Sequence, residues 1–577
     1  MARSSGFILG IGRTLAAAAV LTLVSATPMR AQVVLVPTYP QVGSSNPATA
    51  EPTVPRPTTK PCVVSLFQNL EFADFNLKSF TYTPPKRCSG PWSKVVFTAD
   101  FTVTAGRQYD RTAAFYLGQA SIYYGTTAEP RKALSPSWHV ERDVTDLTPI
   151  FRATQTGEAN IGNFVGTYNG VVYNGIIYAN AALEFYPADF RNPAPRTPDM
   201  VIPVNGTGGD AGTLNTTTDQ ITQTLDLPEN VESAYLDVIA QSQSNDEFWY
   251  TCVPNDEASN VESCGGTAFR ETEVSLDGQP AGVAPVYPWI YTGGIDPYLW
   301  EPIPGVQTLD FKPYRVNLTP FAGELADGNT HTVGVSVYNA NSYFLATANL
   351  LVYLDHGAKK TTGGVISNTL SMAPNPAIQD NIVSSSGNIS GNILTTSSRS
   401  FAISGFIQTS HGKVVTTVQQ NVGFSNNQEF TINSSEYVQD ITQLTTVDST
   451  STTQQGFLVT TDRQNFRYPL TLDYSSGGTA SGFYATTNVS QAYQNHETQG
   501  LFGIPLYSSD VNDAVKTTDT DLFDSSGNFL GPSDGSSSNT YTWHNSLGEC
   551  YGRTIESTAQ VLTSVSNQPS CWAPPRF

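Results

Sequence analysis

The sequence predicts an all-β protein, with two tandem β-sandwich domains followed by a β-rich C-terminal domain. Only 14% of the 577 residues are charged, whereas 46 are Gly and 37 are Pro. This composition suits short strands joined by turns better than long amphipathic helices. The 27 Tyr and 28 Phe residues favour the same class, because aromatic side chains pack well on pleated surfaces.

Alternating hydrophobicity is the third observation. In residues 95–104 (VVFTADFTVT), the apolar side chains fall on one face of a predicted strand and Thr and Asp on the other. Further strands are predicted at 112–117, 121–124, 166–168 onward, 176–186, 233–241, 268–276, 307–316, 332–337, 346–354, 400–409 and 413–422. Strands at this spacing, separated by Gly and Pro turns, indicate sandwiches.

Composition divides the chain into five parts. Residues 1–31 form a predicted signal peptide, residues 32–60 a Pro- and Thr-rich linker, residues 61–190 the first sandwich and residues 191–360 the second. Residues 361–577 are rich in Ser, Thr, Asn and Gln but keep the alternation, which favours a third β domain over a disordered tail.

The N-terminal pattern predicts export. Arg3 and Arg13 precede and flank a short apolar run at 15–24, and Ala26 or Ala31 fits the cleavage site. We expect a secreted protein, periplasmic if the source is bacterial. No later stretch approaches the roughly 18 apolar residues that a membrane helix needs. The net charge of −20 disfavours nucleic acid and anionic membranes as partners, and we expect a monomer.

Six cysteines fit an oxidising compartment. Proximity in the sequence suggests the disulfides Cys62–Cys88, Cys252–Cys264 and Cys550–Cys571, although six cysteines allow 15 pairings. A zinc site is the alternative, but the chain has no CxxC motif. We therefore predict no metal and no cofactor.

Four polar segments combine carboxylates, arginines and aromatic side chains. They are residues 109–111 (YDR), 245–250 (NDEFWY), 269–271 (FRE) and 292–297 (TGGIDP), the last followed by Trp300. Taken singly, each also fits a surface turn, a solvated loop or a core aromatic. Their combination in two adjacent domains is what points to a site.

These residue types suit hydrolysis of an amide without a metal. That reaction needs a carboxylate to activate water or protonate the leaving nitrogen, and donors for the developing oxyanion. A sugar substrate also needs aromatic faces. The candidates are the carboxylates Asp110, Asp246 and Glu247, the donors Arg111 and Arg270, and the ring-stacking residues Trp249, Trp289 and Trp300. No GxSxG, HExxH or Walker motif supports another class.

Longer motifs resemble those of the peptide-N-glycosidase A family, acid-active amidases that release glycans from asparagine. The matching text includes VVFTADF, YDRTAAFYLG, TTAEP (126–130), WHVERDVTDLTPIF, NDEFWY, GTAFRETEVSLDG, YTGGIDPYLWEP and ATANLLVYLD, in this order. The resemblance covers residues 60–357, and residues 361–577 match more loosely.

The resemblance implies two jelly-roll domains with an active site between them, as in the distantly related F-type enzymes. It assigns the catalytic aspartate of a Trp-Asp-Arg segment to Asp110. The F-type glutamate near a Phe-Arg pair is replaced by glycine at the matching distance before Phe269, so we assign its role to Glu247, with Glu271 in reserve. A further F-type glutamate has Asn163 as its nearest counterpart.

The resemblance also implies the reaction. We expect hydrolysis of the amide between the asparagine side chain and the innermost N-acetylglucosamine of glycopeptides and glycoproteins, which leaves aspartate. Asp110 and Glu247 would be catalytic; the predicted substrate-binding residues are Arg111, Asp246, Trp249, Arg270, Glu271, Trp289, Asp296 and Trp300. Alternatives are an inactive carbohydrate-binding protein and a glycosidase that cuts between the two core N-acetylglucosamines.

Overall fold

The computed structural model describes residues 36–568, so the predicted signal peptide and Cys571 lie outside the described residues. Nearly all regular structure in this range is strand, with one four-residue α-helix, α1 (Ala322–Leu325), and six short 3-10 helices. The all-β prediction is confirmed. No helix within residues 36–568 has the length and apolar character needed to span a bilayer.

The first sandwich consists of two four-stranded antiparallel sheets. One sheet has the order β1 (Cys62–Phe72), β10 (Ile177–Pro187), β3 (Trp92–Val103) and β6 (Ser137–Asp143). The other has the order β2 (Lys78–Tyr82), β7 (Gln155–Ile161), β4 (Thr112–Leu117) and β5 (Ala120–Thr126). The hairpin of β8 (Gly166–Tyr168) and β9 (Val171–Tyr173) is inserted before the last strand. Because the first strand pairs with the last across the sheet, this is a jelly roll.

The second sandwich repeats this topology. One sheet has the order β11 (Met200–Val204), β19 (Tyr343–Leu354), β14 (Val231–Gln243) and β17 (Tyr314–Asn317), with β12 (Gly212–Leu214) also paired to β19. The other has the order β13 (Ile221–Leu225), β18 (His331–Tyr338), β15 (Glu271–Leu276) and β16 (Gln279–Pro285). The two predicted sandwiches are therefore built alike.

Period-2 alternation positions the core of the first sandwich. In β10 the residues Ile177, Ala179, Ala181, Leu183 and Phe185 are all buried, and the residues between them are partly exposed up to the strand end. Their register against β3 sets Phe185 opposite Val95 and Leu183 opposite Phe97. The inner faces of both sheets thus close over one apolar cluster.

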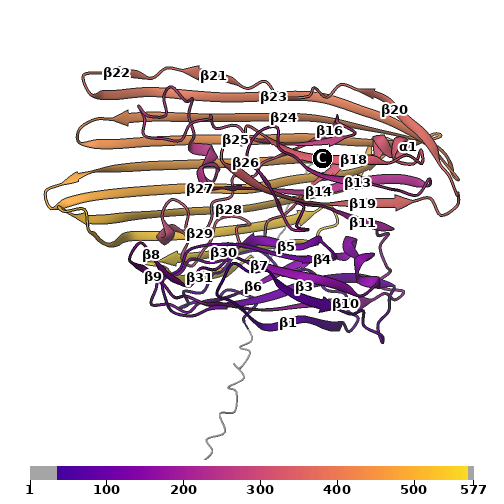
Figure 1. Cartoon of the computed structure of the whole chain (residues 1–577), viewed down its shortest axis with the longest axis horizontal. Helices are drawn as coiled ribbons and strands as arrows, with labels where there is room; N and C mark the ends of the chain where they lie inside the picture. Colours follow the sequence, from indigo (N-terminus) through magenta and orange to yellow (C-terminus); the bar gives the residue numbers. More distant parts are fainter. Residues whose placement is uncertain (1–35, 569–577) are drawn as a thin grey trace, which may run out of the picture. The chain divides into compact units, whose positions relative to one another are not determined.

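The C-terminal region is one large antiparallel sheet, drawn in orange to yellow in Figure 1. Its strands follow chain order: β20 (Thr362–Asn368), β23 (Asn388–Thr409), β24 (Gly412–Ile432), β25 (Glu436–Gln455), β26 (Leu458–Thr479), β27 (Gly482–Leu501), β28 (Ile504–Asp524), β29 (Phe529–Asn545), β30 (Cys550–Thr558) and β31 (Val561–Asn567), with β21 (Ala377–Asp380) and β22 (Val383–Ser385) paired to β23. Buried residues of this sheet share one apolar cluster with the second sandwich, so the polar composition reflects strands with one solvated face.

The segment before the first strand is extended but well contacted. The N–H of Gly43 donates to the carbonyl oxygen of Leu562 at 2.8 Å, and the N–H of Ala48 donates to that of Pro302 at 2.9 Å. Further along, Arg56 pairs with Glu141 of the first sandwich. This segment therefore ties the first sandwich, the second sandwich and the C-terminal sheet together.

Two predicted disulfides are confirmed: Cys62–Cys88 and Cys252–Cys264. The third remains a prediction, because Cys571 is outside the described residues.

The predicted strand 112–117 has the same bounds as β4. The predicted strand 307–316 was wrong over most of its length, since only β17 (Tyr314–Asn317) forms there. The predicted strand 268–276 is shorter in the structure, where β15 begins at Glu271.

Candidate active site

Three carboxyl groups from the two sandwiches form one electrostatic cluster. Asp110 lies between β3 and β4, Glu129 follows β5, and Glu247 lies between the 3-10 helices η3 (Ser244–Asp246) and η4 (Trp249–Thr251). The backbone N–H of Asp110 donates to Oε2 of Glu129 at 2.9 Å. The negative charges of Asp110 and Glu129 both act on Glu247. All three are only partly buried, so a substrate has access to them.

A glycine of the second sandwich closes this cluster. The backbone N–H of Gly293 donates to Oδ2 of Asp110 at 2.8 Å. A Cβ atom at position 293 would lie 2.1 Å from Oε2 of Glu129 and 3.1 Å from Oδ2 of Asp110. Only glycine allows the backbone to approach both carboxylates this closely.

The segment that carries Gly293 is fixed to the first sandwich. The Thr292 hydroxyl donates to the carbonyl oxygen of Thr127 at 2.7 Å, and the N–H of Thr126 donates to that of Thr308 at 2.9 Å. The N–H of Arg111 in turn donates to Oγ1 of Thr127 at 3.1 Å. The site is thus assembled where the two sandwiches meet.

Burial raises the pKa of every member of the cluster, and repulsion by neighbouring carboxylates adds to the rise at Glu129 and Glu247. Burial, followed by the charge of Asp110, raises the pKa of Glu129 to about 7. Burial, followed by the charges of Asp110 and Glu129, raises the pKa of Glu247 to about 8. Burial also raises the pKa of Asp110. The cluster therefore holds protons near neutral pH, where ordinary carboxyl groups are ionised.

The surroundings of the three groups separate their roles. Asp110 accepts a backbone hydrogen bond from Gly293 and lies beside the charge of Arg111, and both lower its pKa against the effect of burial. Glu129 also has partners that favour its charged form, the N–H of Asp110 and the charge of Arg111. For Glu247, by contrast, burial and two negative neighbours raise the pKa, and no partner within residues 36–568 lowers it. Glu247 is therefore the favoured acid of the cluster.

Arg111 is a buried cation beside this cluster. Its guanidinium lies 4.0 Å from the ring centroid of Tyr109, and its Nη1 donates to the carbonyl oxygen of Tyr109. Burial lowers the pKa of Arg111 to about 10, so it stays charged at neutral pH. Its Nε and Nη2 atoms are buried and have no hydrogen-bond partner within residues 36–568, so Arg111 acts on the cluster through its charge.

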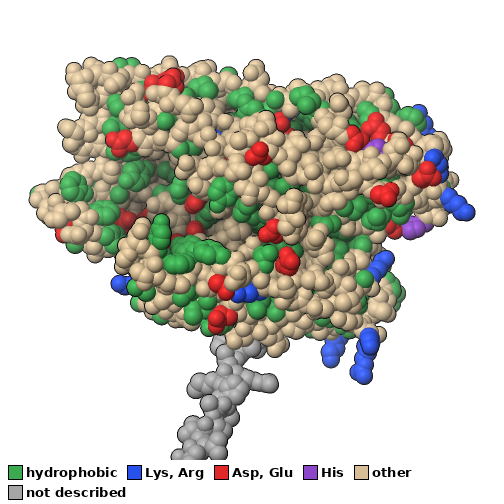
Figure 2. Space-filling model, in the orientation of Figure 1, with side chains coloured by type: hydrophobic (Ala, Val, Ile, Leu, Met, Phe, Trp, Pro, Cys, Tyr) green, Lys and Arg blue, Asp and Glu red, His purple; other side chains and the backbone are tan. Residues whose placement is uncertain are grey.

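Partly exposed aromatic side chains lie next to Asp110. Tyr109 packs edge-on against Tyr173 at a centroid distance of 5.8 Å, and Phe164 lies 6.1 Å from Tyr173. Phe75, which is 66% exposed, stacks on Phe164. Figure 2 shows hydrophobic side chains gathered over the β8–β9 hairpin, beside a hollow in the surface. We call Phe75, Tyr109, Phe164 and Tyr173 the aromatic rim.

Comparison with known proteins shows to which family the chain belongs. Residues 52–371 match the family described as peptide N-acetyl-beta-D-glucosaminyl asparaginase amidase A, which is more than half of the chain. The chain belongs to this family. Residues 392–470 match the C-terminal domain that is named after the same enzymes.

One relative of this amidase A family is peptide-N4-(N-acetyl-beta-glucosaminyl)asparagine amidase A from Prunus dulcis. It is 32% identical over 393 residues, which cover 64% of this chain and 67% of the relative. Among solved structures, PNGF-II is 14% identical with a TM-score of 0.34, covering 52% of this chain and 66% of that one. PNGase F, a glycosylasparaginase from Flavobacterium meningosepticum, is 14% identical with a TM-score of 0.33, covering 51% of this chain and 96% of that one.

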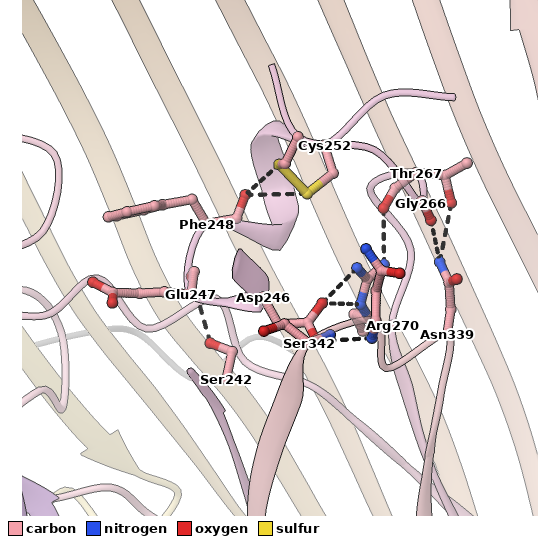
Figure 3. A network of polar contacts seen from close by, with 12 residues as sticks. Ser242, Asp246, Glu247, Phe248, Cys252, Gly266, Thr267, Arg270, Asn339 and Ser342 are labelled. Atoms are coloured by element: carbon pink, nitrogen blue, oxygen red, sulfur yellow. Dashed lines mark hydrogen bonds and ion pairs between the residues drawn. A yellow bond between two sulfur atoms is a disulfide. The ribbon is translucent and has the colours of Figure 1, made fainter. Parts of the chain in front are cut away.

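Asp246 and Arg270, predicted to bind substrate, form an internal ion pair. Nη2 of Arg270 donates to Oδ1 of Asp246 at 2.7 Å, and both side chains are almost completely buried. The N–H groups of Asn341 and Ser342 donate to Oδ2 of Asp246, each at 2.8 Å. Figure 3 shows Glu247 pointing away from this pair. Both groups are saturated by protein partners, so they position the loop of Glu247 rather than contact a substrate.

The three predicted ring-stacking tryptophans lie in the core instead. Trp249 is 0% exposed, Trp289 5% and Trp300 2%. Trp289 stacks on Phe311 at 4.1 Å, and Nε1 of Trp300 donates to the carbonyl oxygen of Gly294 at 2.9 Å. A sugar ring has no access to these faces, so the aromatic rim replaces them as the candidate contact surface.

Three other predicted residues have protein partners. Glu271, the reserve catalytic residue, is 1% exposed and pairs with Arg399 of the C-terminal sheet. Asp296 caps the 3-10 helix η5 (Pro297–Trp300), where it accepts from the N–H of Tyr298. Asn163 donates to the carbonyl oxygens of Phe72 and Gly175. Neither Glu271 nor Asp296 is among the groups whose charges raise the pKa of Glu247.

Sequence reasoning missed Glu129 and Gly293. Both lie in motifs that the resemblance singled out, TTAEP and YTGGIDP. The signal for Gly293 was a glycine pair beside a candidate aspartate. Glu129 had no comparable signal, because a Glu-Pro step after a strand fits an ordinary turn.

Proposed function

We propose that this chain hydrolyses the amide bond between an asparagine side chain and the innermost N-acetylglucosamine of an N-glycan. The observation that carries this proposal is the coupled cluster of Asp110, Glu129 and Glu247, which the backbone of Gly293 closes. Membership of the amidase A family supports the same reaction. The glycan leaves as a glycosylamine, and the asparagine of the peptide becomes aspartate.

Asp110 activates the water. In its ionised form, which the N–H of Gly293 and the charge of Arg111 favour, it accepts a proton from a water molecule whose oxygen forms a bond to the side-chain amide carbon. The N–H of Gly293 keeps Oδ2 of Asp110 in place at 2.8 Å. The positive charge of Arg111 beside Asp110 stabilises the negative charge that develops on the amide oxygen.

Glu247 supplies the proton for the leaving group. A pKa raised to about 8 keeps its carboxyl group protonated at neutral and acidic pH. It donates this proton to the amide nitrogen as the carbon–nitrogen bond breaks, so the glycosylamine leaves as a neutral amine. Glu129 takes part indirectly, because it accepts from the N–H of Asp110 and its charge keeps the pKa of Glu247 high.

N-glycosylated peptides and glycoproteins are the substrates of this reaction. The aromatic rim beside Asp110 suits the apolar faces of N-acetylglucosamine rings. We further propose that the protein is exported and acts as a monomer without a metal in the reaction. The N-terminal sequence pattern and two disulfides support export. N-terminal sequencing of protein recovered outside the producing cell tests it.

A glycopeptide with a single N-glycan, digested in ¹⁸O-labelled water and analysed by mass spectrometry, tests the reaction. We expect intact free glycan and a peptide with aspartate that carries one ¹⁸O atom. The Asp110→Asn variant should leave the glycopeptide intact. A peptide that keeps one N-acetylglucosamine on asparagine would establish the glycosidase instead, and glycan binding without cleavage would establish a carbohydrate-binding protein.

A further inference from the structure

A second acidic cluster lies where the second sandwich meets the C-terminal sheet. Asp296 precedes η5, and Asp519 and Asp521 are on β28. Each offers a carboxylate oxygen, and these oxygens all lie within 4.8 Å of one another. Within residues 36–568, no other group of three acidic, His or Cys residues converges in this way.

The strand geometry explains this convergence. Asp519 and Asp521 are two residues apart on β28, so their side chains lie on the same face. The register between β28 and β29 shifts between Thr518 and Thr520, which leaves Asp519 at a bulge. A Cβ atom on Gly535 of β29 would lie 2.3 Å from Oδ1 of Asp519, so the glycine makes room for this carboxylate.

Buried carboxylate oxygens here lack protein partners. Asp519 is 1% exposed; its Oδ1 accepts a hydrogen bond from Nε2 of Gln560 at 3.4 Å, whereas its Oδ2 has no donor within residues 36–568 outside the cluster itself. Oδ1 of Asp521 is buried and equally unpartnered within that range. No Lys, Arg or His of the described chain forms an ion pair with any of the three aspartates. The nearby Arg131 is paired with Glu301 at 2.7 Å.

This arrangement is costly without a neutralising ligand. The three carboxylate oxygens lie within 4.8 Å of one another and Asp519 is 1% exposed, so their ionised forms repel with little screening by water. Buried charges in proteins are normally paired or coordinate a metal. A proton shared between Asp296 and Asp519 would be the other way to relieve the repulsion.

We propose that Asp296, Asp519 and Asp521 bind a calcium ion that joins the second sandwich to the C-terminal sheet. Three converging carboxylates form an all-oxygen ligand set, which Ca²⁺ prefers, and its flexible coordination suits a bulged strand. Asp521 is only partly buried, so water has access to complete the coordination shell. The ion would lie outside the catalytic cluster and take no part in the hydrolysis.

The proposed ion would also brace the active-site loop. Asp296 is three residues after Gly293, and Trp300 on η5 donates to the carbonyl oxygen of Gly294. Oγ1 of Thr517 on β28 donates to the carbonyl oxygen of Leu299 at 2.8 Å. These contacts already hold η5 against β28, and a cation between Asp296 and Asp519 would add a charged link.

Calcium titration of the full chain tests this inference. After treatment with EDTA and dialysis, we expect calorimetry to show about one Ca²⁺ per chain. Added calcium should raise the unfolding temperature by about 3 °C or more, because only the folded state forms the site. Magnesium should have a smaller effect, because it demands a stricter geometry.

The variant Asp519→Asn/Asp521→Asn separates a calcium site from a shared proton. Without calcium it should unfold at the same or a higher temperature than the wild type, since repulsion is removed, but calcium should no longer shift it. Two control variants, Asp440→Asn on β25 and Asp110→Asn, should show the same calcium-induced rise in unfolding temperature as the wild type. This holds whatever the activity of Asp110→Asn. An unchanged unfolding temperature of the wild type with calcium, or an undiminished shift in the double variant, would overturn the proposal.

Discussion

The backbone N–H of Gly293 in the second sandwich donates a hydrogen bond to Oδ2 of Asp110 in the first, at 2.8 Å. This contact couples the geometry of the proposed water-activating carboxylate to the packing of two domains. It also explains a glycine at position 293, where a Cβ atom would lie 2.1 Å from Oε2 of Glu129. Neither sandwich alone provides the site.

Replacing Gly293 by alanine should therefore disable the enzyme without unfolding it. The added methyl group would push Glu129 and Asp110 apart, and a displacement of about 1 Å costs roughly 100-fold in rate. We expect kcat/KM on a glycopeptide to fall by about this factor, with an unchanged circular dichroism spectrum. The matched control is Gly478→Ala, since a Cβ atom there meets nothing within 4 Å; an equal loss in both variants would contradict this account.

The stability of the fold should respond to pH through Glu247. Its pKa is raised from 4.5 to about 8 in the folded chain, so between these values the folded state binds more protons than the unfolded state. The stability that Glu247 contributes is thus fully present below pH 4.5 and is lost as the pH rises through 8. Glu247→Gln should raise the unfolding temperature at pH 8 but not at pH 4. A gain of the same size at both values would show that burial does not perturb this group.

The pH–rate profile should reveal the coupling between Glu129 and Glu247. If Glu247 is the proton donor, kcat falls as the pH rises through about 8. The charge of Glu129 contributes to that raised pKa, so Glu129→Gln should move the alkaline limb to lower pH. Glu158→Gln on β7 serves as a control that should leave the limb in place. An unmoved limb in Glu129→Gln would exclude the coupling.

Breaking the Asp246–Arg270 pair should affect stability strongly. Both side chains are buried, so Asp246→Asn leaves an uncompensated cation and should lower the free energy of unfolding by about 3 kcal/mol or more. The exposed Lys360–Glu229 pair provides the comparison, and Glu229→Gln should cost less than about 1 kcal/mol. Denaturant unfolding measures both. Similar losses would mean that the buried pair does not position the Glu247 loop.

Much of the fold was accessible from the sequence because apolar and polar residues alternate cleanly in single strands. Residues 95–103 of the predicted strand lie in β3, and 112–117 form β4. The strand predicted over 307–313 does not form, because its apolar residues are buried in a loop that belongs to no sheet of the described chain. The repeated jelly-roll order follows from long-range pairing, such as β1 with β10, which a local pattern does not encode.

The candidate site was predicted in part for a similar reason. Residue types nominated Asp110 and Glu247, whose charges interact in the folded chain. They could not tell a tryptophan that faces a ligand from one in the core, such as Trp249. Nor could they tell that Arg270 is saturated by Asp246 and backbone carbonyls. These distinctions depend on burial and on partners far apart in the chain.

A double-mutant comparison tests most directly whether the two carboxylates act in one step. Single-turnover rates of glycopeptide cleavage would be measured for Asp110→Asn, Glu247→Gln and the double variant, with circular dichroism to establish folding. We predict that each single change lowers the rate by about 1,000-fold, and that the double change costs little more, because residues that act as a unit are not additive. Losses that multiply, or a folded single variant within about threefold of the wild type, would contradict catalysis by Asp110 and Glu247 together.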